Sequence, residues 1–217
     1  KYLNTHHDFD LIVLESGIYD VQEIWRQAKT GKSIESNAPG NIFYMYANSK
    51  ELSPLYDYLT LSAQQNDSAV FLGFDSQLTG GISNTVLIEE LENTLIDASE
   101  DWTTDPYWNK FRTVLQNVLA ANGNALDNTE QQTFLTFLDG ITDSITDIEN
   151  GYWYRILVGL KAQAERQWQI QDRRSIEMGE NIKWLAAQYP NKKMLIWAHT
   201  GHLQKSYNNA GATIAEH

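Results

Sequence analysis

Cysteine is absent from this chain of 217 residues, which excludes disulfides, zinc–thiolate sites and thiol nucleophiles within it. No apolar run approaches the ~20 residues that a membrane-spanning helix needs, and no signal peptide is recognisable. The 16 Lys and Arg are outnumbered by 28 Asp and Glu, and the net charge of −12 argues against binding to nucleic acids or to anionic membranes. These absences leave the compartment open, with the cytoplasm favoured.

Several catalytic motifs are also missing. The sequence has no Gly-x-Ser-x-Gly nucleophile elbow, so a serine hydrolase scheme has no support. It has no phosphate-binding P-loop, no Gly-x-Gly-x-x-Gly and no His-Glu-x-x-His zinc motif. The chemistry must therefore depend on histidines and carboxylates, through either an activated water molecule or a metal ion.

Hydrophobic residues make up 42% of the chain, enough for a substantial core. Four short runs are almost continuously apolar, as strands covered on both faces are, and this pattern favours a parallel sheet between layers of helices. The predicted strands are Leu11–Leu14, Ile42–Tyr46, Ala69–Leu72 and Met194–Ala198.

Helical patterns at Val21–Ala28 and Ser53–Gln65 alternate with the first three runs, as in βαβ units. From Thr85 to Tyr189 the pattern is helical throughout, with a turn at Asn122–Asn128 and a capping box of Thr129 and Gln132. We predict the α/β class: a mostly parallel sheet flanked by helices, with a large inserted all-helical part. Residues 1–83 and 190–217 are expected to form the α/β core, and 84–189 an insertion or lid that shapes the substrate cleft.

Polar residues follow three of the four runs, where ligands bind in open α/β sheets. Glu15 follows the first run, Asp75 follows the third, and His199 and His202 follow the fourth. We therefore expect two carboxylates and two imidazoles at one edge of the sheet. Histidine can act there as a general base, a general acid or an oxyanion donor.

Each of these residues also has a structural interpretation. Glu15 could cap a helix, Asp75 could stabilise its turn, and one histidine could be a satisfied structural residue. Arg174 shares a helix face with Met178, Asn181 and Leu185, from which it could reach a carboxylate or a developing oxyanion, or form only a surface salt bridge. Arg173 competes for the same role. No chemistry is assigned to three other histidines, His6, His7 and His217.

Three segments resemble the erythromycin esterase family. Residues 9–20 (FDLIVLESGIYD) resemble the segment in which a strand ends in an essential Glu, and residues 72–77 (LGFDSQ) resemble its Gly-Phe-Asp segment. The most specific match is 174–202 (RSIEMGENIKWLAAQYPNKKMLIWAHTGH), where Thr200 replaces the usual Asn of a Trp-Ala-His-Asn-x-His motif.

This resemblance implies a parallel α/β core, a helical insertion and a deep cleft. Known members hydrolyse the lactone ester of macrolide antibiotics, and others carry a label about succinoglycan biosynthesis. Glu15, His199 and His202 match the family's active-site positions, and Arg174 and Asp75 match recurring positions. The family's Gly-Glu-x-x-His-Gly segment, with the proposed general base, does not occur here and is expected upstream of the first residue. The resemblance also predicts a final strand that this sequence does not contain.

The resulting hypothesis is hydrolysis of an ester or lactone bond without a metal or other cofactor, on a small-molecule substrate. One alternative is a divalent-metal hydrolase with Glu15, His199 and His202 as a two-His-one-carboxylate site. Another is a non-catalytic protein that holds a glycan or macrolide between aromatic residues such as Trp102, Trp108, Trp153 and Tyr154. The sequence leaves the exact substrate and the oligomeric state open.

Overall fold

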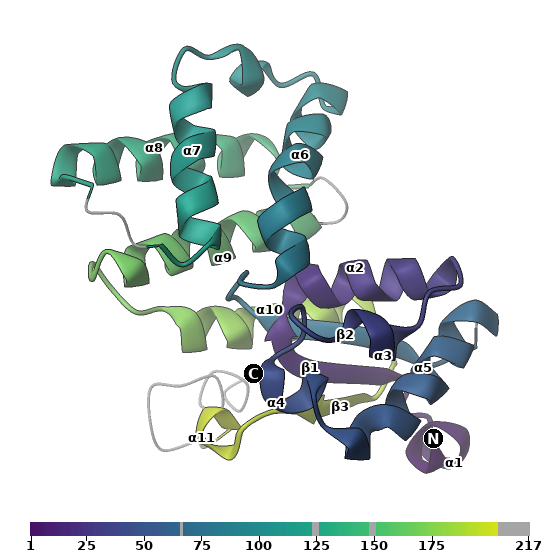
Figure 1. The fold of residues 1–217 in the computed structure, drawn as a ribbon. Coiled ribbons are helices and arrows are strands. Elements are labelled where there is room, and N and C mark those ends of the chain that lie inside the picture. The colour runs from purple at the N-terminus through teal and green to yellow at the C-terminus, as the bar shows by residue number, and fades with distance from the viewer. Residues whose placement is uncertain (66, 123–125, 148–150, 204–217) are drawn as a thin grey trace. The chain divides into compact units, whose positions relative to one another are not determined.

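Among the described residues, a parallel three-stranded sheet combines two strands from the first 75 residues of the chain with one from near its end. A computed structural model describes residues 1–65, 67–122, 126–147 and 151–203. The strands are β1 (Leu11–Gly17), β2 (Val70–Asp75) and β3 (Met194–Trp197), and β1 lies between the other two (Figure 1). Parallel pairing brings the carboxyl ends of all three strands to one edge, as the predicted α/β class requires.

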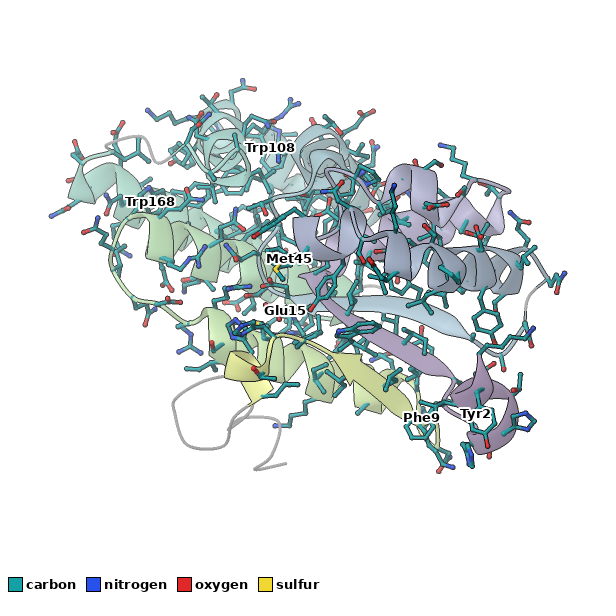
Figure 2. The ribbon with its side chains drawn as sticks, turned by 60° about the horizontal axis from the view of Figure 1, so that its bottom comes forward. Tyr2, Phe9, Glu15, Met45, Trp108 and Trp168 are labelled. Carbon is teal, nitrogen blue, oxygen red and sulfur yellow. The ribbon has the colours of Figure 1, made fainter. Side chains whose placement is uncertain are left out.

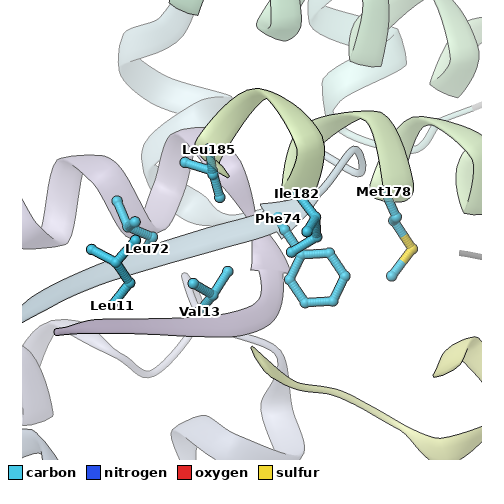
Figure 3. Close-up of a cluster of buried hydrophobic side chains, with 7 residues drawn as sticks. All are labelled: Leu11, Val13, Leu72, Phe74, Met178, Ile182 and Leu185. Atoms are coloured by element: carbon cyan, nitrogen blue, oxygen red, sulfur yellow. The ribbon is translucent and has the colours of Figure 1, made fainter. Parts of the chain in front are cut away.

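Helices cover both faces of this sheet. Leu11, Val13, Leu72 and Phe74 point toward α10 (Arg174–Gln188) and pack on its Met178, Ile182 and Leu185 (Figure 3). The alternate positions face the other way, since a Cβ added to Gly73 would lie 2.9 Å from Val21 of α2 (Ile18–Lys29). Burial on both faces explains why the strands read as continuous apolar runs.

Further contacts fix the amino ends of the strands. In α1 (Tyr2–His7), Asn4 donates a hydrogen bond to the Asp10 carboxylate at 2.9 Å. Lys192, just before β3, forms an ion pair with the other Asp10 oxygen at 2.6 Å. Tyr2 and Phe9 mark this end of the sheet in Figure 2, and Glu15 lies at the opposite end of β1. The sheet is therefore anchored where it carries no candidate site.

One predicted strand is wrong. The run Ile42–Tyr46 contains the first residues of a short helix, α4 (Tyr44–Ala47), and does not pair with the sheet. Ile42 is buried, but Phe43, Tyr44 and Met45 are 42%, 66% and 56% exposed, so the middle of this apolar run faces solvent. Other helical elements between β1 and β2 are α3 (Ile34–Asn37), η1 (Lys50–Leu52) and α5 (Ser53–Gln65).

A second compact unit, Ser76–Arg174, is helical in its described residues. Its elements are α6 (Gly81–Asp97), η2 (Asp101–Thr104), α7 (Trp108–Leu119), α8 (Asn128–Ser144) and α9 (Tyr152–Gln167). Stacked rings of Phe111 and Phe134, 5.0 Å apart, join α7 to α8. The predicted capping box at Thr129 is wrong, because Asp127 caps α8 by accepting a bond from the Glu130 amide at 2.8 Å.

The first unit comprises Lys1–Asp75 and the described residues from Ser175 on, so α10 belongs with the sheet. The sequence had placed 84–189 in the insertion, whereas α10 carries an apolar face that packs on β1 and β2. The predicted role of the insertion as a lid stays a prediction. Among the described residues, no helix is long and apolar enough to cross a membrane. The final helix described is α11 (Thr200–Leu203).

Candidate active site

An irregularity at the end of β1 positions the first candidate residue. Leu14 pairs with Gly73 and Gly17 pairs with Asp75. Two residues of β1, Glu15 and Ser16, therefore lie opposite a single residue of β2, which makes a β-bulge. Such bulges re-aim side chains near functional sites. A glycine is needed opposite, because a Cβ on Gly73 would lie 2.7 Å from the carbonyl oxygens of Ser16 and Gly17.

The Glu15 carboxylate is buried and shared between two partners. The residue is only 5% exposed, although it lies near the carboxyl end of β1 (Figure 2). Oε2 accepts a hydrogen bond from the backbone N–H of His199 at 2.7 Å, and Oε1 lies 3.4 Å from Nε2 of His202. A buried carboxylate needs such partners, so Glu15 ties β1 to the segment that follows β3.

The two histidines are held by one helical turn. The His202 amide donates to the His199 carbonyl oxygen at 2.9 Å, and the ring centroids are 6.3 Å apart. The Gly201 amide donates to Nδ1 of His199 at 3.1 Å. A neutral imidazole whose Nδ1 accepts a bond carries its proton on Nε2, so His199 presents a hydrogen-bond donor.

Tyr46 adds a group that the sequence prediction missed. Burial raises the pKa of its hydroxyl first, and the negative charge of Glu15 raises it further. The ring contacts Trp197 edge to face, with centroids 6.1 Å apart. Tyr46 thus stays a neutral hydroxyl near the carboxylate. The sequence does not reveal this group, because the apolar run around Tyr46 predicts a strand, whereas Tyr46 lies in the short helix α4.

The remaining predicted residues have different positions. Asp75 is the last residue of β2, is 6% exposed and pairs with Gly17 in register, so it belongs to the same sheet edge as Glu15. Arg174 begins α10 but belongs to the second unit, where its carbonyl oxygen accepts a 3.4 Å bond from the Ser76 hydroxyl. Of the predicted residues, polar contacts thus join Glu15 to both histidines, whereas Asp75 and Arg174 make other contacts.

The three groups do not have the spacing of a metal centre. In the part of the chain that the structure describes, no group of three or more His, Asp or Glu side chains is arranged to hold an ion. Nε2 of His202 faces Glu15 directly, and Nδ1 of His199 is occupied by the Gly201 amide.

A parallel sheet with a buried carboxylate and two histidines at its carboxyl edge defines an α/β protein equipped for acid–base chemistry. The sequence model of the Erythromycin esterase family matches residues 4–217, so the chain belongs to that family. The resemblance predicted from the three motifs is confirmed, and so is the predicted fold class.

Known relatives agree in fold at low identity. A Bacillus subtilis (strain 168) protein named "Putative hydrolase YbfO" is 24% identical over 238 residues, which cover 94% of this chain and 51% of the relative. A crystal structure of a Bacillus cereus protein superposes with a TM-score of 0.72 at 19% identity, over 99% of this chain and 57% of the other.

A mutant of the erythromycin esterase EreC in its open conformation gives a TM-score of 0.63 at 15% identity, over 99% of this chain and 61% of that one. A structure described as a succinoglycan biosynthesis protein gives 0.68 at 14% identity, with 99% and 56% covered. This chain spans about half the length of the curated relative, and these structural likenesses show the fold alone.

Proposed function

We propose that this chain belongs to a hydrolase that cleaves an ester or lactone bond with water and without a metal. Family membership supports the hydrolase class. The observation that carries the proposal is the buried Glu15 carboxylate, which contacts Nε2 of His202 at 3.4 Å and the His199 amide at 2.7 Å.

In this proposal, His199 and His202 have different tasks. His199 donates from Nε2 to the carbonyl oxygen, which becomes an oxyanion when water attacks the carbonyl carbon. In this step His202 acts as an imidazolium that Glu15 pairs with at Nε2. Its Nδ1–H gives a proton to the leaving alkoxide as the ester C–O bond breaks, and the proton that the base takes from water later restores the imidazolium. We expect the base that takes the water proton to be the histidine of the family's Gly-Glu-x-x-His-Gly segment, which does not occur in this sequence.

Three variants of the full-length protein test these assignments: Glu15→Gln, His199→Ala and His202→Ala. With p-nitrophenyl butyrate and erythromycin as probes, we expect Glu15→Gln and His202→Ala to lower kcat by about 10²–10⁴-fold, because proton transfer is lost. His199→Ala should lower kcat about 10²–10³-fold through loss of an oxyanion donor. KM should change little in each case.

Matched controls are Glu51→Gln and His6→Ala, which change exposed residues of the same types. They should retain full turnover. Circular dichroism would show that each variant is folded. Near-normal kcat in all three site variants would sink the proposal.

Metal independence is a separate expectation. Overnight dialysis against EDTA should leave the turnover of the full-length enzyme unchanged. Elemental analysis should find far less than one metal ion per chain. Stoichiometric zinc or manganese, with activity lost to the chelator and restored by the ion, would instead favour the two-His-one-carboxylate alternative.

A further inference from the structure

The helical unit contains a pocket of its own. It has a volume of about 750 Å³ and lies between η2, the start of α7 and the first half of α8. That volume is within the range of small-molecule sites. Every lining residue belongs to the Ser76–Arg174 unit, so the pocket shares no residue with the Glu15 site.

The wall of this pocket is built around a fixed indole. Trp102 donates from Nε1 to the Ser144 hydroxyl at 3.0 Å, and its ring lies edge to face with Phe137, with centroids 5.1 Å apart. Its six-membered ring lies directly on Gly140, where any Cβ would collide with it. A hydrogen bond, a ring contact and a glycine thus hold the indole in one orientation before any ligand binds.

Tyr107 and Phe137 continue the aromatic wall, with ring centroids 5.1 Å apart. The Tyr107 hydroxyl is buried and has no hydrogen-bond partner among the described residues. Because this oxygen is closed to solvent, Tyr107 contributes to the pocket through its ring rather than through its hydroxyl.

The exposed lining is mainly apolar and carries no charge. The polar residues Asn128 and Gln132 and three threonines contribute to it, and no Asp, Glu, Lys or Arg does. The nearest charged pair, Lys110 and Glu130, is closed on itself by a 2.8 Å ion pair. In a chain that is 20% charged, this lining favours a neutral ligand.

We propose that this pocket binds a neutral pyranoside, as a single sugar or the terminal ring of a short oligosaccharide. A pyranose has an apolar C–H face that can lie on an indole and hydroxyl edges that exchange bonds with amides and hydroxyls. An anion would lack a cation to pair with here, and a quaternary ammonium could form no hydrogen bond with Asn128 or Gln132.

The test titrates the full chain with methyl β-D-glucopyranoside, maltose and cellobiose while the indole N–H signals of its seven tryptophans are followed by ¹⁵N NMR. Trp102→Phe assigns the relevant signal. We expect that signal to shift selectively and saturably, with a Kd of roughly 0.1–10 mM. Measured by isothermal titration calorimetry, which does not need the Trp102 signal, Trp102→Ala should weaken binding at least about tenfold.

Tyr154→Ala is the matched control, because Tyr154 is an exposed aromatic residue of the same unit that does not line the pocket. It should bind sugar normally. Glu15→Gln should also bind normally, so loss of turnover and loss of sugar binding can be told apart. No selective shift with any of the three sugars, unaltered affinity in Trp102→Ala, or tighter binding of tetramethylammonium or glucuronate would overturn the proposal.

Discussion

Gly73 is the residue on which the shape of the candidate site depends most directly. Gly73→Ala would place a Cβ 2.7 Å from two backbone carbonyl oxygens, and backbone cannot move aside as a flexible side chain can. We expect a loss of about 1–3 kcal/mol in the free energy of unfolding, measured by urea denaturation. Unchanged stability would mean that the bulge in β1 is more compliant than its register indicates.

Gly201 offers a matched comparison with the opposite outcome. Among the described residues, a Cβ there would meet the His199 ring, at 3.1 Å from Nδ1 and 3.4 Å from Cε1, and that ring can yield. Gly201→Ala should therefore alter stability by less than about 0.5 kcal/mol but lower kcat by about tenfold, because the displaced imidazole is misaligned. Steady-state kinetics on an ester substrate check this. A normal kcat would argue that His199 needs no fixed orientation.

The relative positions of Glu15, His199 and His202 could be predicted from the sequence because they follow from the topology of the sheet. Parallel strands deliver their carboxyl ends to one edge, so Glu15, His199 and His202 could be expected together without knowing any distance. Two features were invisible. The His199 backbone amide, not its ring, makes the 2.7 Å bond to Glu15. Tyr46 approaches the same carboxylate from a segment whose structure was predicted wrongly.

At the scale of elements, the contact of α10 with the sheet carries much of the stability of the first unit. Leu185 is 2% exposed and packs among Leu11, Leu72 and their neighbours. Leu185→Ala should cost about 2–5 kcal/mol through lost burial and a residual cavity. Lys183→Ala, on the solvent side of the same helix, should change stability by less than about 0.5 kcal/mol. Equal effects in thermal unfolding would contradict this packing.

The contact of α5 with β2 predicts a pH dependence. Tyr56 is 1% exposed against Phe71, and burial, followed by the charge of Glu35, raises its pKa from 10.0 to about 12. Below pH 10 both folded and unfolded chains keep this proton. Between pH 10 and 12 only the unfolded chain releases it, so the folded state should lose about 3 kcal/mol relative to Tyr56→Phe.

Urea denaturation of both proteins from pH 8 to 12 measures this difference. Tyr2→Phe serves as the control, since Tyr2 is 67% exposed, and its stability should follow that of the parent chain. Parallel curves for the parent and Tyr56→Phe would show that the Tyr56 hydroxyl ionises equally in both states.

Element prediction from the sequence succeeded where composition and burial agree. Leu11–Leu14 and Ala69–Leu72 overlap real strands because helices cover both faces of the sheet. Ile42–Tyr46 has the same composition, but its aromatic residues are largely exposed beside the end of β1, where the Phe43 amide donates to the Ser16 hydroxyl. Apolar composition alone could not distinguish these cases, because exposure depends on tertiary contacts.

At the scale of the whole molecule, the net charge of −12 predicts how stability responds to salt. Exposed ion pairs such as Lys110–Glu130 contribute about 0–1 kcal/mol each, so screening them costs little. Screening the excess negative charge should dominate. We expect the Tm to rise by about 2–4 °C between 10 and 150 mM NaCl, with the same rise in KCl. A falling Tm would show that attractive pairs outweigh the net repulsion.

The central place of β1 has a consequence for biosynthesis. Its Glu15 meets the His199 amide across 184 positions of sequence, and β3, which pairs with the second edge of β1, is made long after the other two strands. At ribosomal speeds of about 5–20 residues per second, the nascent carboxylate waits roughly 10–40 s for its partner. During that interval one edge of β1 has no neighbour, which makes this stage of translation the point where a chaperone would matter most.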